Sequence, residues 1–307
     1  MWWFVLALIA MLFWSGSDIF SKVGSKPDDK NSHFKMVIAV GLVMGLHAFY
    51  EIFVNRVPIT FEAALQYLPA SLLYIAAMVL GYIALRYIEL SVSSPICNTS
   101  GALSSLFIIL FFFNRSGIED TVSLVGTIAG IVLCAAGVVG LSIVEQKEDD
   151  EIRRLRQEHA NRKYAKSLIA ILLPILYCAI DAAGTVADTF ILETLDETVA
   201  NVAYELTFLV LGIICAIYVY AIKREKFSFK REWAKGVGGI CETVGQFAYI
   251  FAIAANSVAA APIISCYCAV SVLWSRIFLK EKLSWKHYLM IAITIVGIVV
   301  LAIFGGE

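Results

Sequence analysis

Apolar residues occur in ten runs along the chain, separated by polar connections. Each run is about 20 residues long, the length that a helix needs to cross the hydrocarbon core of a membrane at about 1.5 Å per residue. We therefore predict ten transmembrane helices: Trp2–Phe20, Phe34–Val54, Ala64–Tyr87, Val92–Phe113, Thr121–Val144, Ser167–Leu192, Val199–Ile222, Trp233–Ala255, Ser257–Leu279 and Trp285–Phe304.

One connection is long and rich in charge, and it divides the chain into two halves. Five predicted helices precede it in residues 1–145, and five follow it in residues 167–307. Within the connection, residues 146–166, Asp149 and Asp150 stand four positions before Arg153 and Arg154, the spacing at which opposite charges meet on a helix. We interpret it as a solvated linker that could form a short surface helix.

The two halves share an order of motifs. Pro95 and Pro262 each stand near the start of an apolar run, where a first helical turn tolerates the missing N–H. Gly137 and Gly297 each stand in the run that closes a half. An aromatic residue four positions before an aspartate also recurs, at a constant offset of 163 residues: Trp14–Asp18 and Tyr177–Asp181. We therefore interpret the chain as an internal duplication.

This order resembles the EamA repeat of the drug/metabolite transporter (DMT) superfamily, in which a proline-containing apolar helix is followed by a Gly-Glu-Arg-Leu-Thr loop and a glycine-containing helix. The matching loop in the second half is Lys280–Ser284, and the first half departs from the pattern at Phe113–Glu119. The resemblance covers nearly the whole chain. It implies an all-α polytopic membrane protein with ten transmembrane helices in two inverted five-helix repeats, and a transport function without a specified substrate.

Composition agrees with a polytopic membrane protein. The 307 residues are 60% hydrophobic, against about 45–50% in soluble domains. The net charge is only -1 and most charged residues lie in the connections, so we expect no nucleic-acid partner. Seven cysteines lie in apolar runs without a C-x-x-C pair, and we interpret them as packing residues rather than a metal site. Because no G-x-S-x-G, H-E-x-x-H or Walker motif is present, we predict no enzyme activity and no cofactor.

Basic residues indicate the orientation in the membrane. Of the 24 lysines and arginines, all but Arg56 and Arg115 fall near connections that follow odd-numbered helices. Basic residues in short loops stay on the cytoplasmic side. We therefore predict a multi-pass protein of the cell membrane with odd-numbered loops in the cytoplasm and both termini outside. The lysines follow the first helix of the first half but the second helix of the second half, as expected if the halves insert in opposite orientations.

Polar side chains inside the apolar runs indicate where a substrate binds. Such groups are costly in a bilayer and normally face an aqueous cavity or a partner. They form stripes at helical spacing, and we predict a substrate site from these positions: Trp14, Asp18, Asn98, Tyr177, Asp181, Glu205, Glu242, Gln246, Tyr249, Tyr267, Ser271 and Trp274. Four carboxylates among aromatic rings favour a cation or zwitterion through charge pairing and cation–π contact.

Simpler interpretations stand beside this one. Asp18 could only pair with Lys22 one turn later, and Asp188 is expected near a helix end at the membrane interface. We interpret His47 as a packing residue with satisfied hydrogen bonds. A further aromatic face is formed in the third run by Tyr74, Met78 and Tyr82.

The sequence thus predicts a secondary transporter that moves a small polar, cationic or zwitterionic metabolite by alternating access. Its energy would come from proton coupling or exchange, because the chain has no nucleotide-binding motif. Its expected partners are the small-molecule substrate and the lipid bilayer, and it would act as a monomer or homodimer. The alternative is a membrane scaffold, partner subunit or lipid-handling protein that transports nothing. A transporter requires the polar stripes to converge near the middle of the membrane, whereas a scaffold could scatter them.

Orientation can be tested directly. Reporter fusions after Glu307 should read as external, and reporters inserted in residues 146–166 should read as cytoplasmic, because the basic residues hold the odd loops inside. A cytoplasmic reading at Glu307 would overturn the assigned orientation.

Overall fold

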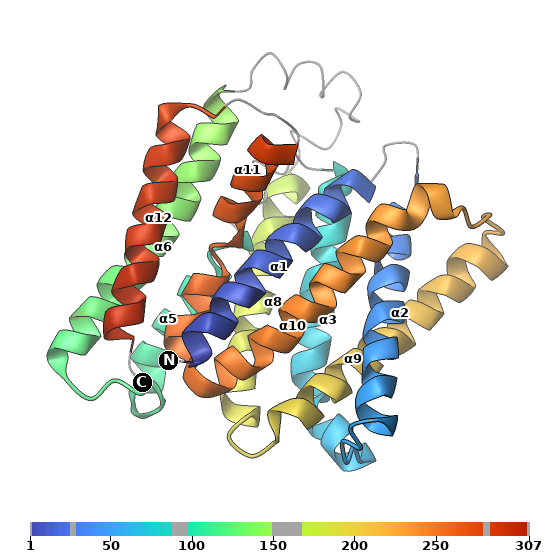
Figure 1. Cartoon of the computed structure of the whole chain (residues 1–307), viewed down its shortest axis with the longest axis horizontal. Coiled ribbons are helices and arrows are strands. Elements are labelled where there is room, and N and C mark those ends of the chain that lie inside the picture. The colour runs from blue at the N-terminus through green and yellow to red at the C-terminus, as the bar shows by residue number, and fades with distance from the viewer. Residues whose placement is uncertain (1, 25–28, 88–96, 149–167, 279–282, 306–307) are drawn as a thin grey trace.

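The computed structural model describes residues 2–24, 29–87, 97–148, 168–278 and 283–305. Within these ranges the chain forms ten α-helices in one bundle and no strand (Figure 1). The α-helices are α1 (Trp2–Gly24), α2 (Ser32–Phe53), α3 (Phe61–Tyr87), α5 (Ser100–Phe111), α6 (Thr121–Glu148), α8 (Leu168–Ile191), α9 (Glu197–Ala216), α10 (Phe229–Ile264), α11 (Tyr267–Phe278) and α12 (Trp285–Phe304). Two short helices join them, the 3-10 helix η1 (Phe113–Arg115) and the π-helix η2 (Ile217–Ile222).

Seven helices in the described ranges are long and apolar enough to cross a membrane: α1, α2, α3, α6, α9 with η2, α10 and α12. The predicted all-helical membrane architecture is confirmed at this level. The linker beyond residue 148, Pro95 and residues 280–282 of the Lys280–Ser284 loop lie outside the described residues.

The boundary between the predicted eighth and ninth helices falls where the sequence places it, although α10 continues across it. Asn256 is the one residue inside α10 with a non-helical backbone (φ −159°, ψ 85°). Its side-chain oxygen accepts a hydrogen bond from the N–H of Ala259 at 3.0 Å, as an N-cap residue does. Its amide nitrogen donates to the carbonyl of Gly305 at 2.6 Å, which ties this boundary to the end of α12.

The predicted ninth helix is interrupted, contrary to expectation. The helix that restarts after Asn256 ends at Ile264, and α11 begins only at Tyr267. Pro262 lies in the second turn after that restart rather than in the first, so its missing N–H removes an intrahelical hydrogen bond. The predicted fourth helix also differs, because a turn at Asn98 and Thr99 precedes α5. The structure therefore has a break in each of these two runs.

Glycines let facing helices approach closely. A Cβ atom added to Gly137 on α6 would lie 2.9 Å from the backbone nitrogen of Thr294 on α12. A Cβ atom on Gly41 of α2 would lie 2.7 Å from the carbonyl oxygen of Phe208 on α9. Real side chains would push these backbones apart, so the glycines set the spacing, as small residues do between membrane helices.

Five charged residues, which we call the charge cluster, join four segments at the end of the bundle where α2 and α10 begin (Figure 1). The ammonium group of Lys35 lies 3.0 Å from Asp29 and 2.7 Å from Glu225. The ammonium group of Lys235, only 2% exposed, lies 2.6 Å from Glu232 and 3.7 Å from Asp29. Three acids and two bases thus satisfy one another in a largely buried position.

The lysines alter the titration of the acids outside the membrane-spanning helices. The hydrogen bond from Lys35 holds the pKa of Glu225 below its usual value. Burial raises the pKa of Asp29, but the hydrogen bond from Lys35 and the charges of Lys35 and Lys235 outweigh it, so the net shift is downward. A lowered pKa means that the unfolded chain binds protons more readily than the folded one. The stability contributed by these pairs is therefore present at neutral pH and lost as the pH falls through the acidic range.

Replacing Lys35 by Met should remove this contribution. At pH 7.5 we expect a loss of about 3–5 kcal/mol, because buried acids lose their partner, and at pH 4 we expect a smaller loss. Thermal unfolding of purified protein in detergent at both pH values measures the difference. Lys286→Met, at an exposed position on α12, is the matched control. An equal loss at both pH values would contradict the pairing.

Candidate functional site

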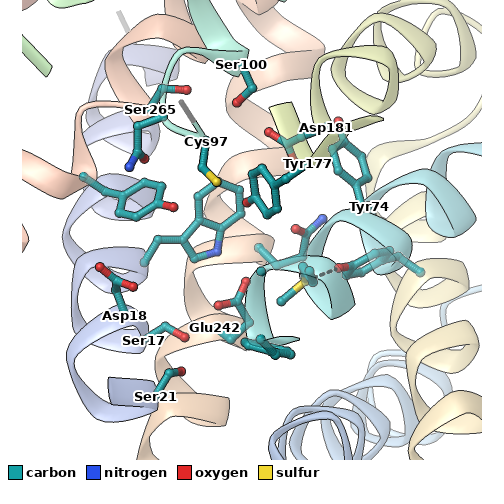
Figure 2. A pocket seen from close by; sticks show the side chains of 18 residues that line it. Ser17, Asp18, Ser21, Tyr74, Cys97, Ser100, Tyr177, Asp181, Glu242 and Ser265 are labelled. Carbon is teal, nitrogen blue, oxygen red and sulfur yellow. Dashed lines mark hydrogen bonds between the residues drawn. The ribbon is translucent and has the colours of Figure 1, made fainter. Parts of the chain in front are cut away.

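A cavity with a volume of about 1010 Å³, counting its open mouth, lies between α1, α3, α5, α8, α9 and α10 and the turn before α11. Figure 2 shows its side chains from close by. The lining consists of Trp14, Ser17, Asp18, Ser21, Tyr74, Met78, Gly81, Tyr82, Cys97, Asn98, Ser100, Tyr177, Asp181, Tyr204, Glu242, Gln246, Ser265 and Tyr267. Helices from both halves of the chain therefore contribute to one space.

Eight of the twelve residues proposed from sequence line this cavity: Trp14, Asp18, Asn98, Tyr177, Asp181, Glu242, Gln246 and Tyr267. The remaining four, Glu205, Tyr249, Ser271 and Trp274, lie elsewhere. The polar stripes of α1, α8 and α10 thus converge. Whether these residues bind a substrate stays a prediction.

Glycines hold two aromatic rings in place at the cavity wall. A Cβ atom on Gly245 of α10 would lie 2.7 Å from the indole nitrogen of Trp14. The Trp14 ring also stacks on Tyr249, with ring centroids 5.0 Å apart and planes 29° apart. Similarly, a Cβ atom on Gly184 of α8 would lie 2.7 Å from the ring of Tyr74. Tyr249 therefore supports the cavity from behind without lining it.

Three carboxylates reach the cavity from three helices. Asp18 comes from α1, Asp181 from α8 and Glu242 from α10 (Figure 2). Asp18 and Asp181 are both close enough to repel the charge of Glu242, which is 8% exposed. Lys22 attracts Asp18 from one turn away, yet Asp18 also lines the cavity, so pairing with Lys22 does not account for its position.

Several buried donors at the cavity have no hydrogen-bond partner in the described part of the chain. They are the side-chain nitrogen of Gln246, the indole nitrogen of Trp14 and the hydroxyl group of Tyr82. Gln246 is only 3% exposed. An unsatisfied buried polar group costs about 1–3 kcal/mol, so a molecule that accepts hydrogen bonds here would be stabilised.

Asp188 belongs to a hydrogen-bond group that borders the cavity through Tyr74. We call it the tyrosine cluster: Tyr67, Tyr74, Thr185, Asp188 and Tyr249. The carboxylate of Asp188 accepts from the hydroxyl group of Tyr67 at 2.7 Å and from that of Tyr74 at 2.8 Å. The hydroxyl group of Tyr249 lies within hydrogen-bond distance of those of Thr185 and Tyr74 and can donate to one of them. Asp188 lies in the last turn of α8, near a helix end as expected, and α3 presents these hydroxyl groups to it and leaves it 0% exposed. Its depth in a membrane stays a prediction.

The prediction that Glu205 faces the same space as Glu242 was wrong. Glu205 is 0% exposed and lies between α2 and α9, where His47 Nδ1 is 2.9 Å from both carboxylate oxygens. Asn201 donates to Glu205 at 3.0 Å. Tyr204 lines the cavity instead. One residue along a helix turns the direction of the side chain by about 100°, so the α9 stripe was assigned to the wrong neighbour.

His47 therefore pairs with a buried acid rather than serving only as a packing residue. Its Nε2 atom also lies 3.5 Å from Glu51, one turn later on α2.

Ser271 and Trp274 tie α11 to α1. Trp274 donates from its indole nitrogen to the hydroxyl oxygen of Ser15 at 3.0 Å. Ser271 donates to the carbonyl oxygens of Tyr267 at 3.1 Å and of Ser15 at 3.4 Å. Ser271 also hydrogen-bonds to Asp18, which lines the cavity, although neither Ser271 nor Trp274 lines it.

Sequence reasoning missed part of the lining. Ser17 and Ser21 stand three and seven positions after Trp14, which places them on the same helical face, so spacing could have identified them. Ser265 and Ser100 had no such signal, because each lies beside a helix break that hydropathy does not show.

The fold and the cavity together define a class, a polytopic helical membrane protein with a central polar cavity. A family model described as "Sugar transport protein" matches residues 5–306. The chain therefore belongs to this membrane transporter family.

A solved structure described as "Crystal structure of protein" is similar to this chain, with a TM-score of 0.69. The match covers 98% of this chain and 96% of the other, at 14% sequence identity. At that identity the likeness shows the fold alone. None of the curated proteins compared matches the chain.

The tyrosine cluster can be tested by a double-mutant cycle. Asp188→Ala and Tyr67→Phe each remove one side of a buried hydrogen bond outside the cavity lining. We expect a coupling of about 1.5–3 kcal/mol, the usual range for a hydrogen bond to a charged group, measured by reversible unfolding in mixed micelles. Tyr50→Phe, at an exposed position of α2, should show no coupling to Asp188→Ala. Additive losses for Asp188 and Tyr67 would refute the interaction.

Proposed function

We propose that the chain is a secondary transporter that moves a sugar of monosaccharide size by alternating access. The observation that carries this proposal is the cavity, in which unpartnered donors stand beside carboxylates and aromatic rings. The family description supplies the substrate class.

The chemistry of a sugar suits this lining. Each sugar hydroxyl group both donates and accepts hydrogen bonds, so it can donate to a carboxylate such as Glu242 and accept from the amide of Gln246. The apolar face of a sugar ring can lie against aromatic side chains such as Trp14 and Tyr177. A few convergent polar groups in a largely apolar pocket are typical of sites that fix the orientation of a small molecule.

The repeat organisation is part of the proposal, and the helix pairs support it. The main contacts join α1 with α10, α3 with α8, α2 with α9, and α6 with α12. Let α1, α2, α3, α5 and α6 correspond in order to α8, α9, α10, α11 and α12. Replacing each helix by its counterpart then turns the pair α1–α10 into α8–α3 and leaves the pairs α2–α9 and α6–α12 unchanged. Two five-helix repeats, in residues 1–145 and 167–307, with inverted orientation as in the DMT superfamily, would produce this pattern. The breaks at Asn98–Thr99 and Ser265–Cys266 would then be equivalent.

In alternating access, the two ends of the bundle must close in turn on either side of the cavity. One cluster lies toward each end. The tyrosine cluster lies toward the end of the bundle where α8 ends, and the charge cluster lies toward the end where α10 begins (Figure 1). We propose that they open in turn. Following the basic residues, we place the charge cluster on the cytoplasmic side of a cell membrane and the termini outside.

A cationic or zwitterionic metabolite remains the second candidate, favoured by the three carboxylates. The scaffold alternative is disfavoured because the polar stripes of α1, α8 and α10 meet at one cavity. We keep proton coupling or exchange as the energy source, since a buried carboxylate can carry a proton. A monomer or homodimer also stays a prediction.

Uptake of labelled monosaccharides into proteoliposomes tests the proposal. Gln246→Met keeps the volume of the side chain but removes its donor, so the KM should rise about tenfold, the equivalent of one lost hydrogen bond. Gln66→Met, at an exposed position on α3, is the matched control and should leave the KM unchanged. Absence of uptake of every pentose and hexose by the unaltered protein would overturn the sugar assignment. An unchanged KM in Gln246→Met would remove Gln246 from the site.

A further inference from the structure

The charged side chains that line the cavity all have the same sign. Among the described residues that line it, the charged ones are all acidic: Asp18, Asp181 and Glu242. Lys22 lies one turn beyond Asp18 and attracts it without lining the cavity. Even with Lys22 counted, three acids face one base.

This imbalance distinguishes the cavity from the buried acids that have a base within ion-pair distance. Glu205 has His47 at 2.9 Å, and Asp29 has Lys35 at 3.0 Å. Among the described residues, Glu242 has a hydrogen bond from the neutral hydroxyl group of Ser17 but no base, and two further carboxylates repel it. Charges of one sign in a medium of low dielectric constant are unfavourable unless a counter-charge is present. The cavity therefore favours a ligand that brings a positive charge.

A second observation shows that the cavity is built for a ligand and is not only an acidic cluster. Gln246 is 3% exposed, lines the cavity on the same face of α10 as Glu242, and has no partner for its side-chain nitrogen. The ligand must therefore also accept hydrogen bonds, which a bare ammonium ion cannot do. Figure 2 shows the ring of Tyr177 beside Asp181, and the lining also includes the rings of Trp14 and Tyr267. Such rings attract cations.

We infer that the preferred substrate is an amino sugar, a monosaccharide that carries an ammonium group. This inference rests on the proposed function. The hydroxyl oxygens of the sugar accept from Gln246 and Trp14, the ring lies against the aromatic side chains, and the ammonium group donates to Glu242 and its neighbouring carboxylates. A neutral sugar satisfies the donors but leaves the acids without a counter-charge.

The experiment compares three sugars with the same pyranose ring. Proteoliposomes take up labelled glucose in the presence of unlabelled glucose, glucosamine or N-acetylglucosamine, in which acetylation removes the charge. Glucosamine should compete at least about tenfold more strongly than glucose, because hydrogen bonds to an ionised partner are roughly twice as strong as neutral ones. N-acetylglucosamine should lose that advantage.

Variants assign the effect to the carboxylates. Glu242→Gln keeps the shape and removes the charge, so the preference for glucosamine over glucose should fall severalfold while glucose still competes. Asp181→Asn should act in the same direction, which keeps the test informative if one variant fails to fold. The matched control is Glu205→Gln, a buried acid outside the cavity lining, which should preserve the preference.

Three results would overturn the inference. Glucosamine could compete no better than glucose, or Glu242→Gln and Asp181→Asn could keep the full preference. Alternatively, an imposed sodium gradient could drive glucose uptake that Glu242→Gln abolishes, which would assign the positive charge to a co-transported sodium ion. If neither neutral nor amino sugars are taken up or compete, the proposed sugar transport itself fails, and this outcome is distinct from the other three.

Discussion

Lipid offers no hydrogen-bond partners, and this constraint organises the interior of the bundle. Each strongly polar side chain inside a membrane-spanning helix must meet another polar group or an aqueous cavity. Asp188 meets tyrosine hydroxyl groups, Glu205 meets His47, and Lys235 meets Glu232. At the cavity this satisfaction is incomplete, because Gln246 keeps an unpartnered donor there while Asp18 and Asp181 repel Glu242. A bound molecule can accept a hydrogen bond from Gln246 and can donate to the carboxylates. The same constraint that stabilises the fold therefore also points to the site.

Glycines, which have no side chain, help to set the shape of the bundle. Gly245 lets the Trp14 ring lie against α10, and Gly184 lets the Tyr74 ring lie against α8. A methyl group at either position would meet the ring, so the orientation of two cavity walls depends on glycines in facing helices. The same close approach at Gly137 joins α6 to α12. The helix spacing that small residues allow thus sets the shape of the cavity.

The interrupted ninth run brings backbone irregularity to the cavity. Pro262 lacks the N–H that would bond to the preceding helical turn, and the chain turns after Ile264, before α11 begins at Tyr267. Ser265, in this turn, accepts a hydrogen bond from the N–H of Gly101 at 3.1 Å, which joins it to the start of α5. Irregular backbone at membrane depth is tolerated where it lines a cavity, and Ser265 does line it.

Run length and polar spacing were sufficient for the helical architecture and for eight lining residues, since both depend on local periodicity. Asp18 and Asp181 could be identified from an aromatic residue one turn earlier, and Gln246 from Glu242 one turn before it. Local periodicity does not show which neighbour a polar stripe faces. Only the packed bundle decided that Glu205 faces His47 while Tyr204 faces the cavity, and that Asp188 is buried against tyrosines of α3. These outcomes depend on the rotation of each helix about its axis, which contacts between distant parts of the chain determine.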